Sequence, residues 1–137
     1  MVHPTTLYKF TAGLICLFCL NHIFVNEMFL NMNFRNLPEI DSMHNFLARS
    51  MGILGLFYSG LLVQLPTDVA EAVFKYQTLF IVTFYVTGPI MVYMTFEVDT
   101  MNFMPGLFLF GALVLTYLYT LATFKPTEGV KMLEVAE

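Results

Sequence analysis

The chain alternates between long apolar stretches and short segments that carry its charges. Residues 10–26, 50–67, 76–96 and 100–124 contain no Asp, Glu, Lys or Arg, and a charged residue stands at both ends of each stretch. A helix needs about 20 predominantly apolar residues to cross the hydrocarbon core of a bilayer. The pattern therefore predicts four transmembrane helices and an integral, multi-pass membrane protein.

These stretches predict a single all-α domain over residues 1–137, a bundle of four transmembrane helices with both termini on the same side of the membrane. The connection between the second and third spans is very short, so these two helices should be antiparallel neighbours. The predicted spans are about residues 7–27, 43–65, 69–96 and 105–124, followed by a short polar tail at 125–137.

The residues between Pro66 and Lys75 predict where the second span ends and where the third begins. Pro66 should end the second span, because the residue before a proline disfavours helix. Asp68 should then cap the third span, with Glu71 three residues later in the spacing of a capping box. Lys75 follows Glu71 by one turn, which favours an ion pair between them.

Two further prolines and a polar segment complete the predicted layout. Pro89 lies inside the third span and predicts a kink, since proline removes a backbone hydrogen bond. Pro105 suits the first turn of the fourth span. Residues 28–42 contain three Asn, an Arg, a Pro and two acids, so we expect them at the membrane surface.

Composition agrees with this layout and excludes one class of partner. The chain is 58% hydrophobic and only 12% charged, whereas about a quarter of the residues in a soluble domain are charged. Four spans with their connections leave no length for a second domain. A net charge of −4 with six basic residues cannot build the basic patch that nucleic acid requires, so no nucleic-acid partner is expected.

Basic residues near the ends of the spans predict the orientation. Four lysines fall on the side of the termini, against two arginines toward the other side, so we expect the termini to face the cytoplasm, matrix or stroma. The opposite side is acidic. We expect the first span to be a retained anchor, because polar residues stand where a signal-peptide cleavage site would lie. The lysines are Lys9, Lys75, Lys125 and Lys131, the arginines are Arg35 and Arg49, and the acids are Glu27, Glu39, Asp41, Glu97 and Asp99.

Arg49 is the first candidate for a functional site. It lies about two turns, roughly 10 Å, inside the second span, and a charge within a span costs a few kcal/mol on insertion scales. One interpretation is structural, in which the side chain extends to the interface or pairs with Asp41, Glu97 or Asp99. The other is a contact with a lipid headgroup, a quinone or a pigment.

His22 is the second candidate. With His44 it falls near the acidic face, and a single imidazole can ligate haem iron, zinc or the magnesium of chlorophyll. The chain has no HExxH motif and no second His one turn away, so the alternative is a histidine that is hydrogen-bonded across helices. We therefore predict no protein metal site, and His22 is the residue to test as a pigment or haem ligand.

Other notable residues predict packing. Cys16 and Cys19 form a CxxC spacing, but an apolar helix disfavours the thiolate that redox and metal chemistry need. Gly55 and Ser59 have the small-xxx-small spacing that lets helices approach closely. The stretch from Arg49 through Gly52 to Gly55 resembles the second helix of small DoxX-like four-helix membrane proteins. That resemblance covers seven residues, implies no site residue and assigns no family.

No catalytic set is recognisable, so no enzymatic activity is expected. The leading hypothesis is an accessory, non-catalytic subunit of a large respiratory or photosynthetic complex, in the mitochondrial inner membrane or the thylakoid. Its aromatic- and Met-rich faces would then pack on partner subunits, lipids or pigments, with chlorophyll or carotenoid in the photosynthetic case. The alternative is a lipid-binding, small-molecule-binding or lipid-modifying protein with a pocket between the first three spans, around Arg49, His22 and His44. A transporter ranks third.

Overall fold

The computed structural model describes residues 2–37, 39–95, 97–98 and 100–131. In this part of the chain every regular element is a helix, and the only strand-like feature is an isolated bridge between Phe34 and Val98. The helices are α1 (Pro4–Phe24), α2 (Asn26–Asn33), α3 (Ser42–Gln64), α4 (Thr67–Ala72), α5 (Phe74–Thr95) and α6 (Thr100–Thr123).

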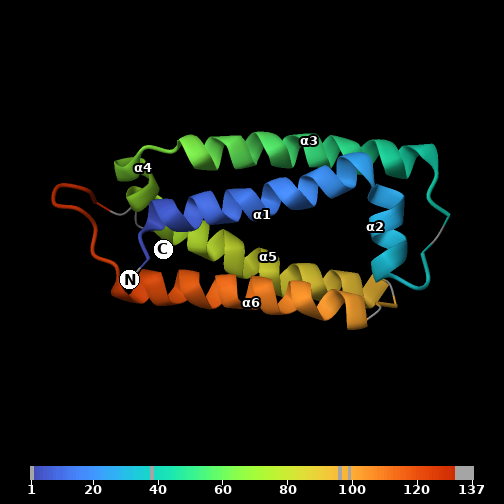
Figure 1. Cartoon of the computed structure of the whole chain (residues 1–137). Coiled ribbons are helices and arrows are strands. Elements are labelled where there is room, and N and C mark those ends of the chain that lie inside the picture. Colours follow the sequence, from blue (N-terminus) through green and yellow to red (C-terminus); the bar gives the residue numbers. More distant parts are fainter. Residues whose placement is uncertain (1, 38, 96, 99, 132–137) are drawn as a thin grey trace.

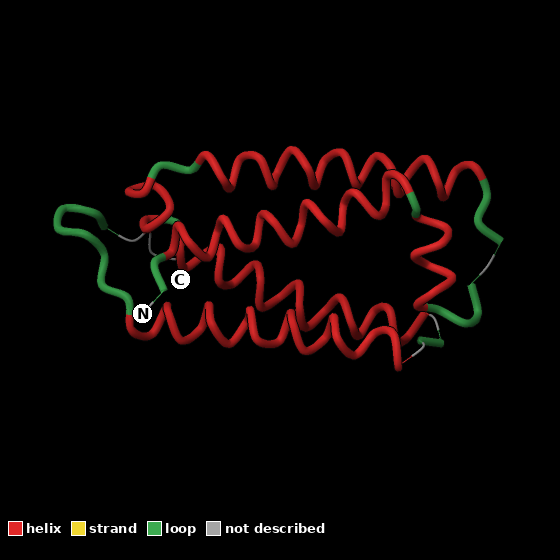
Figure 2. The backbone as a smooth tube through the Cα atoms, viewed as in Figure 1, coloured by secondary structure: helices red, strands yellow, loops and turns green. Residues whose placement is uncertain are grey.

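Four of these helices, α1, α3, α5 and α6, are long and apolar enough to cross a membrane. Helix α1 runs along α3 and α5 runs along α6, while α2 lies across one end of the bundle and α4 lies at the other end (Figure 1). The connecting loops lie at the two ends, and both ends of the described chain lie at the α4 end (Figure 2). The predicted all-α bundle of four spanning helices is confirmed, and it supports an integral, multi-pass membrane protein.

The first two spans differ from their predicted bounds through local capping. Helix α1 begins at Pro4, earlier than predicted, because His3 accepts a hydrogen bond from the backbone N–H of Thr5 at 3.3 Å. Asp41 caps α3 in the same manner, accepting from the backbone N–H of His44 at 2.8 Å. Within the polar segment that follows the first span, α2 is a helix that the sequence pattern did not predict.

The predicted start of the third span was wrong. Pro66 is the N-cap of α4, which places Asp68 inside the first turn of this short helix and not at its cap. The break between α4 and α5 falls at Val73. Glu71 makes no capping box, because its carboxylate is bound by residues from both ends of the chain. Among the described residues Glu71 and Lys75 form no ion pair, so that prediction was also wrong.

Pro89 and Pro105 both lie inside spanning helices. Pro105 was expected in the first turn of the fourth span, but α6 already begins at Thr100 and contains Pro105 in its interior. Pro89 lies inside α5, as predicted, and the helix continues to Thr95. The kink at Pro89 stays a prediction.

Small side chains bring α1 and α3 into close contact. A Cβ added to Gly52 would lie 2.7 Å from Cγ1 of Ile23 and 3.0 Å from the carbonyl oxygen of Cys19. A Cβ added to Gly55 would collide with Sγ of Cys19. One turn later, the Ser59 hydroxyl donates to the Ala12 carbonyl at 2.7 Å. The predicted small-xxx-small packing is therefore used within the molecule, and Cys19 packs in this interface as expected.

The buried core lies in the half of the bundle next to α4. Phe74 stacks on Tyr117 with ring centroids 5.6 Å apart, and the Tyr8 hydroxyl donates to the Ala70 carbonyl at 2.9 Å. The hydroxyls of Thr11 and Tyr117 are hydrogen-bonded at 2.8 Å, which joins α1 to α6. The core residues are Leu7, Tyr8, Ala70, Phe74, Ile81, Leu113, Val114 and Tyr117.

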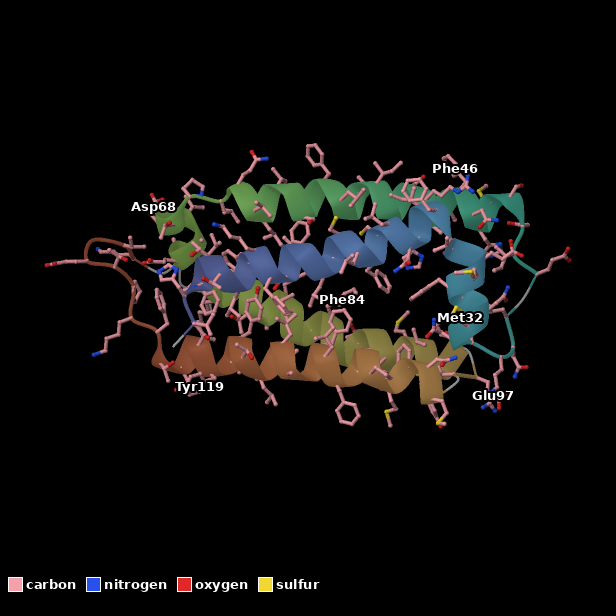
Figure 3. The ribbon with its side chains drawn as sticks, in the orientation of Figure 1. Met32, Phe46, Asp68, Phe84, Glu97 and Tyr119 are labelled. Carbon is pink, nitrogen blue, oxygen red and sulfur yellow. The ribbon has the colours of Figure 1, made fainter. Side chains whose placement is uncertain are left out.

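Most of the helical surface faces outward. In each spanning helix at most 28% of the most apolar stretch is buried within the chain. Large apolar side chains such as Phe46 and Tyr119 point away from the bundle (Figure 3). A bilayer or another membrane protein must cover this surface, because water cannot do so without a large free-energy cost.

Candidate functional site

A recess opens where the end of α1, the helix α2 and the first turns of α3 meet. It has a volume of about 440 Å³, within the range of small-molecule sites, which is about 300–1,000 Å³. We call it the Arg49 recess. Its lining residues are Phe24, Val25, Asn26, Glu27, Met28, Asn31, Asn45 and Arg49.

Helix α3 supplies the hydrogen-bond donors that line one side of the Arg49 recess. Asn45 and Arg49 are four residues apart, so they lie on the same face of the helix. Arg49 is exposed to the recess and makes no hydrogen bond or ion pair with any residue that the structure describes. The predicted pairing of Arg49 with Asp41 or Glu97 is therefore absent from this part of the chain, and Asp99 lies outside the described residues. A guanidinium offers five N–H donors and always carries its charge.

Asn26 connects the helices that form the recess. Its side-chain oxygen is hydrogen-bonded to Nδ1 of His22 at 2.8 Å, and its amide nitrogen donates to Oδ1 of Asn45 at 3.2 Å. Asn26 is only 6% exposed, and the helix break at Val25 turns it inward. Because Oδ1 of Asn45 is occupied by Asn26, the amide nitrogen of Asn45 is the group left to donate toward a ligand.

Helix α2 supplies an opposite wall that carries a negative charge. Glu27 and Asn31 lie one turn apart on α2, and both line the recess. Glu27 is exposed and, like Arg49, has no hydrogen-bond or ion-pair partner within the described ranges. Phe24, Val25 and Met28 add an apolar border. The recess therefore presents an unpaired cation and an unpaired anion from two different helices.

Both histidines were expected in the pocket with Arg49, but neither is among the described residues that line the Arg49 recess. His22 reaches the Arg49 recess only through Asn26, and its ring packs edge-on against Phe18 and Phe29 with centroids 4.6 and 5.5 Å apart. His44 turns to Asp41, with Nδ1 and Oδ1 2.8 Å apart. The His22–Asn26 bond joins residues that are four apart along the chain, at the junction of α1 and α2, so a hydrogen bond of His22 across the spanning helices stays a prediction. The role of His22 as a pigment or haem ligand stays a prediction.

The pocket was predicted to lie between the first three spans, and the third span was wrong as one of its walls. No residue of α5, the third span, lines the Arg49 recess. Helix α2 takes that place, because it lies across this end of the bundle (Figure 1). A hydrogen bond from Arg35 N–H to the Glu97 carbonyl, at 2.9 Å, joins this end to the connection between α5 and α6. A second, from the Asn102 side chain to the Met32 carbonyl at 2.6 Å, joins α2 to the first turn of α6.

The described side chains that line the recess are two of opposite charge, three amides and an apolar border. In the described part of the chain no three His, Cys, Asp or Glu side chains gather closely enough to hold a metal ion. A second recess of about 360 Å³ lies between α5 and α6 around Pro89, and none of the described residues that line it is charged. It fits an apolar chain but offers little to orient a head group.

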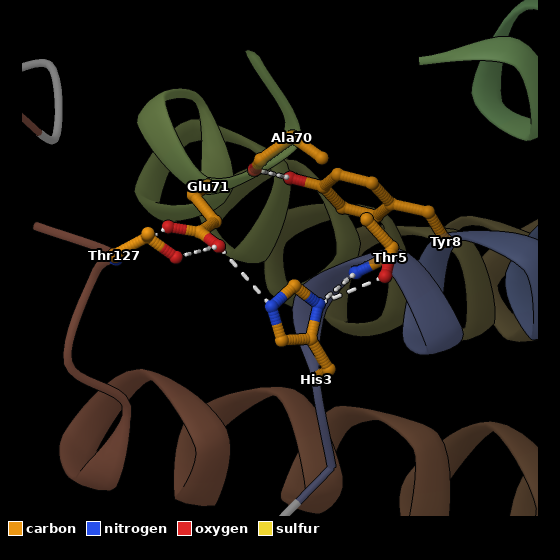
Figure 4. A network of polar contacts seen from close by, with 6 residues as sticks. All are labelled: His3, Thr5, Tyr8, Ala70, Glu71 and Thr127. Atoms are coloured by element: carbon orange, nitrogen blue, oxygen red, sulfur yellow. Dashed lines mark hydrogen bonds and ion pairs between the residues drawn. The ribbon is translucent and has the colours of Figure 1, made fainter. Parts of the chain in front are cut away.

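A buried carboxylate, Glu71, lies at the opposite end of the bundle, and its partners differ from those that the sequence predicts. Glu71 is fully buried, and it accepts hydrogen bonds from the backbone N–H and the hydroxyl of Thr127, at 2.7 and 2.9 Å, and from Nε2 of His3, at 3.1 Å (Figure 4). These partners are 56 and 68 residues away along the chain, so no local pattern could reveal them. The cluster fastens both ends of the described chain to α4.

Hydrogen bonding decides the acidity of Glu71. Burial alone would raise its pKa, but the two hydrogen bonds from Thr127 and the contact with His3 outweigh burial and hold the pKa below the ordinary glutamate value. Glu71 is therefore ionised at neutral pH, and it lines neither of the two recesses described above.

Comparison of the chain with protein-family models, curated proteins and solved structures finds no match.

Proposed function

We propose that this membrane protein binds the anionic group in the head of an amphiphile in the Arg49 recess and carries out no chemistry on it. One observation carries the proposal: Arg49 lies inside a spanning helix, lines a recess and has no partner among the described residues. Placing a charge within a span costs a few kcal/mol on insertion scales, so such residues commonly serve a binding or transport role. A bound anion would supply the missing partner.

The surroundings of Arg49 favour an amphiphile over a fully water-soluble anion. Phe24 and Met28 border the recess and are 76% and 60% exposed, so an acyl chain can leave the recess along them. The amide nitrogen of Asn45 supports the guanidinium with a second donor. Two donor groups one turn apart match the several acceptor oxygens of a phosphate or carboxylate.

The test compares two charge-removing variants, Arg49→Gln and Lys75→Gln. Lys75 is an exposed cation on α5 and lies outside the recess, so it is the matched control. Each purified protein is delipidated in mild detergent and titrated with mixed micelles of phosphatidylethanolamine, phosphatidylglycerol and phosphatidylcholine, and bound lipid is counted by native mass spectrometry. We expect Arg49→Gln to weaken the lipid affinity about tenfold or more, because it removes a charge-assisted hydrogen bond to the lipid head. Lys75→Gln should leave the lipid affinity unchanged. Equal binding by the two variants contradicts the proposal.

A second candidate function is an accessory, non-catalytic subunit of a large respiratory or photosynthetic membrane complex. The outward apolar surface of the four spanning helices supports it, because partner helices, lipids or pigments can cover that surface. The test is native electrophoresis of membranes dissolved in mild detergent, with mass spectrometry and absorption spectra of the band that contains this chain. Migration with redox subunits and a haem or chlorophyll spectrum supports the candidate, and migration as a small free species contradicts it.

A further inference from the structure

The Arg49 recess carries both signs of charge on separate walls. Arg49 and Asn45 stand on α3, and Glu27 and Asn31 stand on α2. Arg49 and Glu27 do not pair with each other, although oppositely charged side chains that share a small space normally gain by pairing. Asn26 bonds to Asn45 across the gap between the two helices and helps to hold the walls in place.

We infer that the ligand head is a zwitterion with a primary ammonium group, the chemistry of a 2-aminoethyl phosphate ester. The inference rests on the proposed function and names the ligand class of the same site. The phosphate lies against Arg49 and the amide nitrogen of Asn45. The ammonium lies against Glu27 and the side-chain oxygen of Asn31.

The acceptors on α2 distinguish a primary ammonium from a quaternary one. A carboxylate and an amide oxygen accept hydrogen bonds, and a primary ammonium donates up to three. A trimethylammonium group donates none, and its recognition typically uses a cage of aromatic rings. Among the described residues that line the recess, Phe24 is the only aromatic one.

Net charge at this end of the bundle disfavours a purely anionic head. Among the described residues Glu27, Glu39, Asp41 and Glu97 are acidic here, against Arg35 and Arg49. The excess of acids repels a head with a net negative charge, while a zwitterion has none. Electrostatic repulsion and the missing ammonium both weaken phosphatidylglycerol relative to phosphatidylethanolamine.

The experiment titrates each lipid separately, with identical acyl chains, into the wild-type protein and into Glu27→Gln, Arg49→Gln and Glu39→Gln. Glu39 is an exposed acid at the same end and outside the recess, so it is the matched control for Glu27. We expect the wild type to bind phosphatidylethanolamine about tenfold more tightly than phosphatidylglycerol or phosphatidylcholine. Glu27→Gln should bring the affinity for phosphatidylethanolamine to within about twofold of that for phosphatidylglycerol, and Glu39→Gln should keep the wild-type preference.

The outcomes separate this inference from the proposed function. Equal wild-type affinity for the three lipids, with weaker binding by Arg49→Gln, overturns the zwitterion and leaves the anion site standing. Unchanged binding by Arg49→Gln overturns both. Both charged side chains are exposed and unpaired in the described chain, so the variants should fold, and a single monodisperse peak on gel filtration checks this.

Competition with soluble 2-aminoethyl phosphate identifies the source: displacement of the lipid assigns the site to the head group alone, and no displacement assigns it to the whole lipid.

Discussion

Substitution of three glycines on α3 by alanine tests the close contact between α1 and α3. A Cβ at Gly52 would meet the backbone carbonyl oxygen of Cys19 at 3.0 Å as well as Cγ1 of Ile23 at 2.7 Å, so the backbone of α1 must yield by a few tenths of an ångström in addition to the Ile23 side chain. A Cβ at Gly55 would collide with Sγ of Cys19, a short side chain that is only 6% exposed. A Cβ at Gly60 would meet nothing within 4 Å.

Gly60→Ala is the control because all three changes share the gain in helix propensity. Overpacking a well-packed interface costs about 1–3 kcal/mol. Relative to Gly60→Ala, we expect Gly55→Ala to lose about 1 kcal/mol and Gly52→Ala to lose about 2–3 kcal/mol, since backbone yields less than a side chain. The measurement is the free energy of unfolding from titration of SDS into mild detergent micelles, followed by near-ultraviolet circular dichroism.

A double-mutant cycle makes the test specific to the proposed collision. Cys19→Ala removes Sγ, so combining it with Gly55→Ala should recover most of the loss, with a favourable coupling of about 1 kcal/mol. The same Cys19→Ala change should not rescue Gly52→Ala, because the carbonyl oxygen of Cys19 remains. If Gly52→Ala and Gly55→Ala are as stable as Gly60→Ala, the inferred close contact is wrong.

Three further predictions follow from other contacts. The carboxylate of Glu71 has a pKa below its ordinary value, so its stabilisation is present above about pH 4.3 and is lost as the pH falls through the lower, folded-state value. The melting temperature of the wild type should therefore drop on acidification more steeply than that of Glu71→Gln, and parallel curves would contradict this. Tyr117→Phe should lose about 1 kcal/mol, because it leaves the buried Thr11 hydroxyl without its partner, and adding Thr11→Val should restore part of that loss in the same SDS titration. Asn26→Ala should weaken lipid binding about fivefold, because Asn45 loses the bond that orients it. Asn21→Ala should have no effect, since within the described chain the Asn21 side chain bonds only the Leu17 carbonyl of its own helix. Equal affinities of the two variants would refute a positioning role.

The candidate site was predicted only in part. Arg49 was found because a charge within an apolar span is visible in the sequence itself. Glu27 was placed on the same acidic side, but a recess shared by Arg49, Glu27 and Asn31 was not predicted, because these residues line one recess only when α2 folds across the end of the bundle. His22 and His44 were grouped with Arg49 by their distance along the chain from the polar end. In the structure His22 is instead hydrogen-bonded to Asn26, and His44 to Asp41.

Sequence alone determined the spanning helices. In a bilayer every backbone N–H and carbonyl must find a partner within the chain, so an apolar stretch of sufficient length becomes a helix whatever its neighbours are. Only the tertiary structure decided which polar groups meet. Glu71 and Thr127, or Asn26 and Asn45, come together because particular helix faces pack against one another. Such pairings depend on the directions of helices that are distant in the chain, and local residue patterns do not encode these directions.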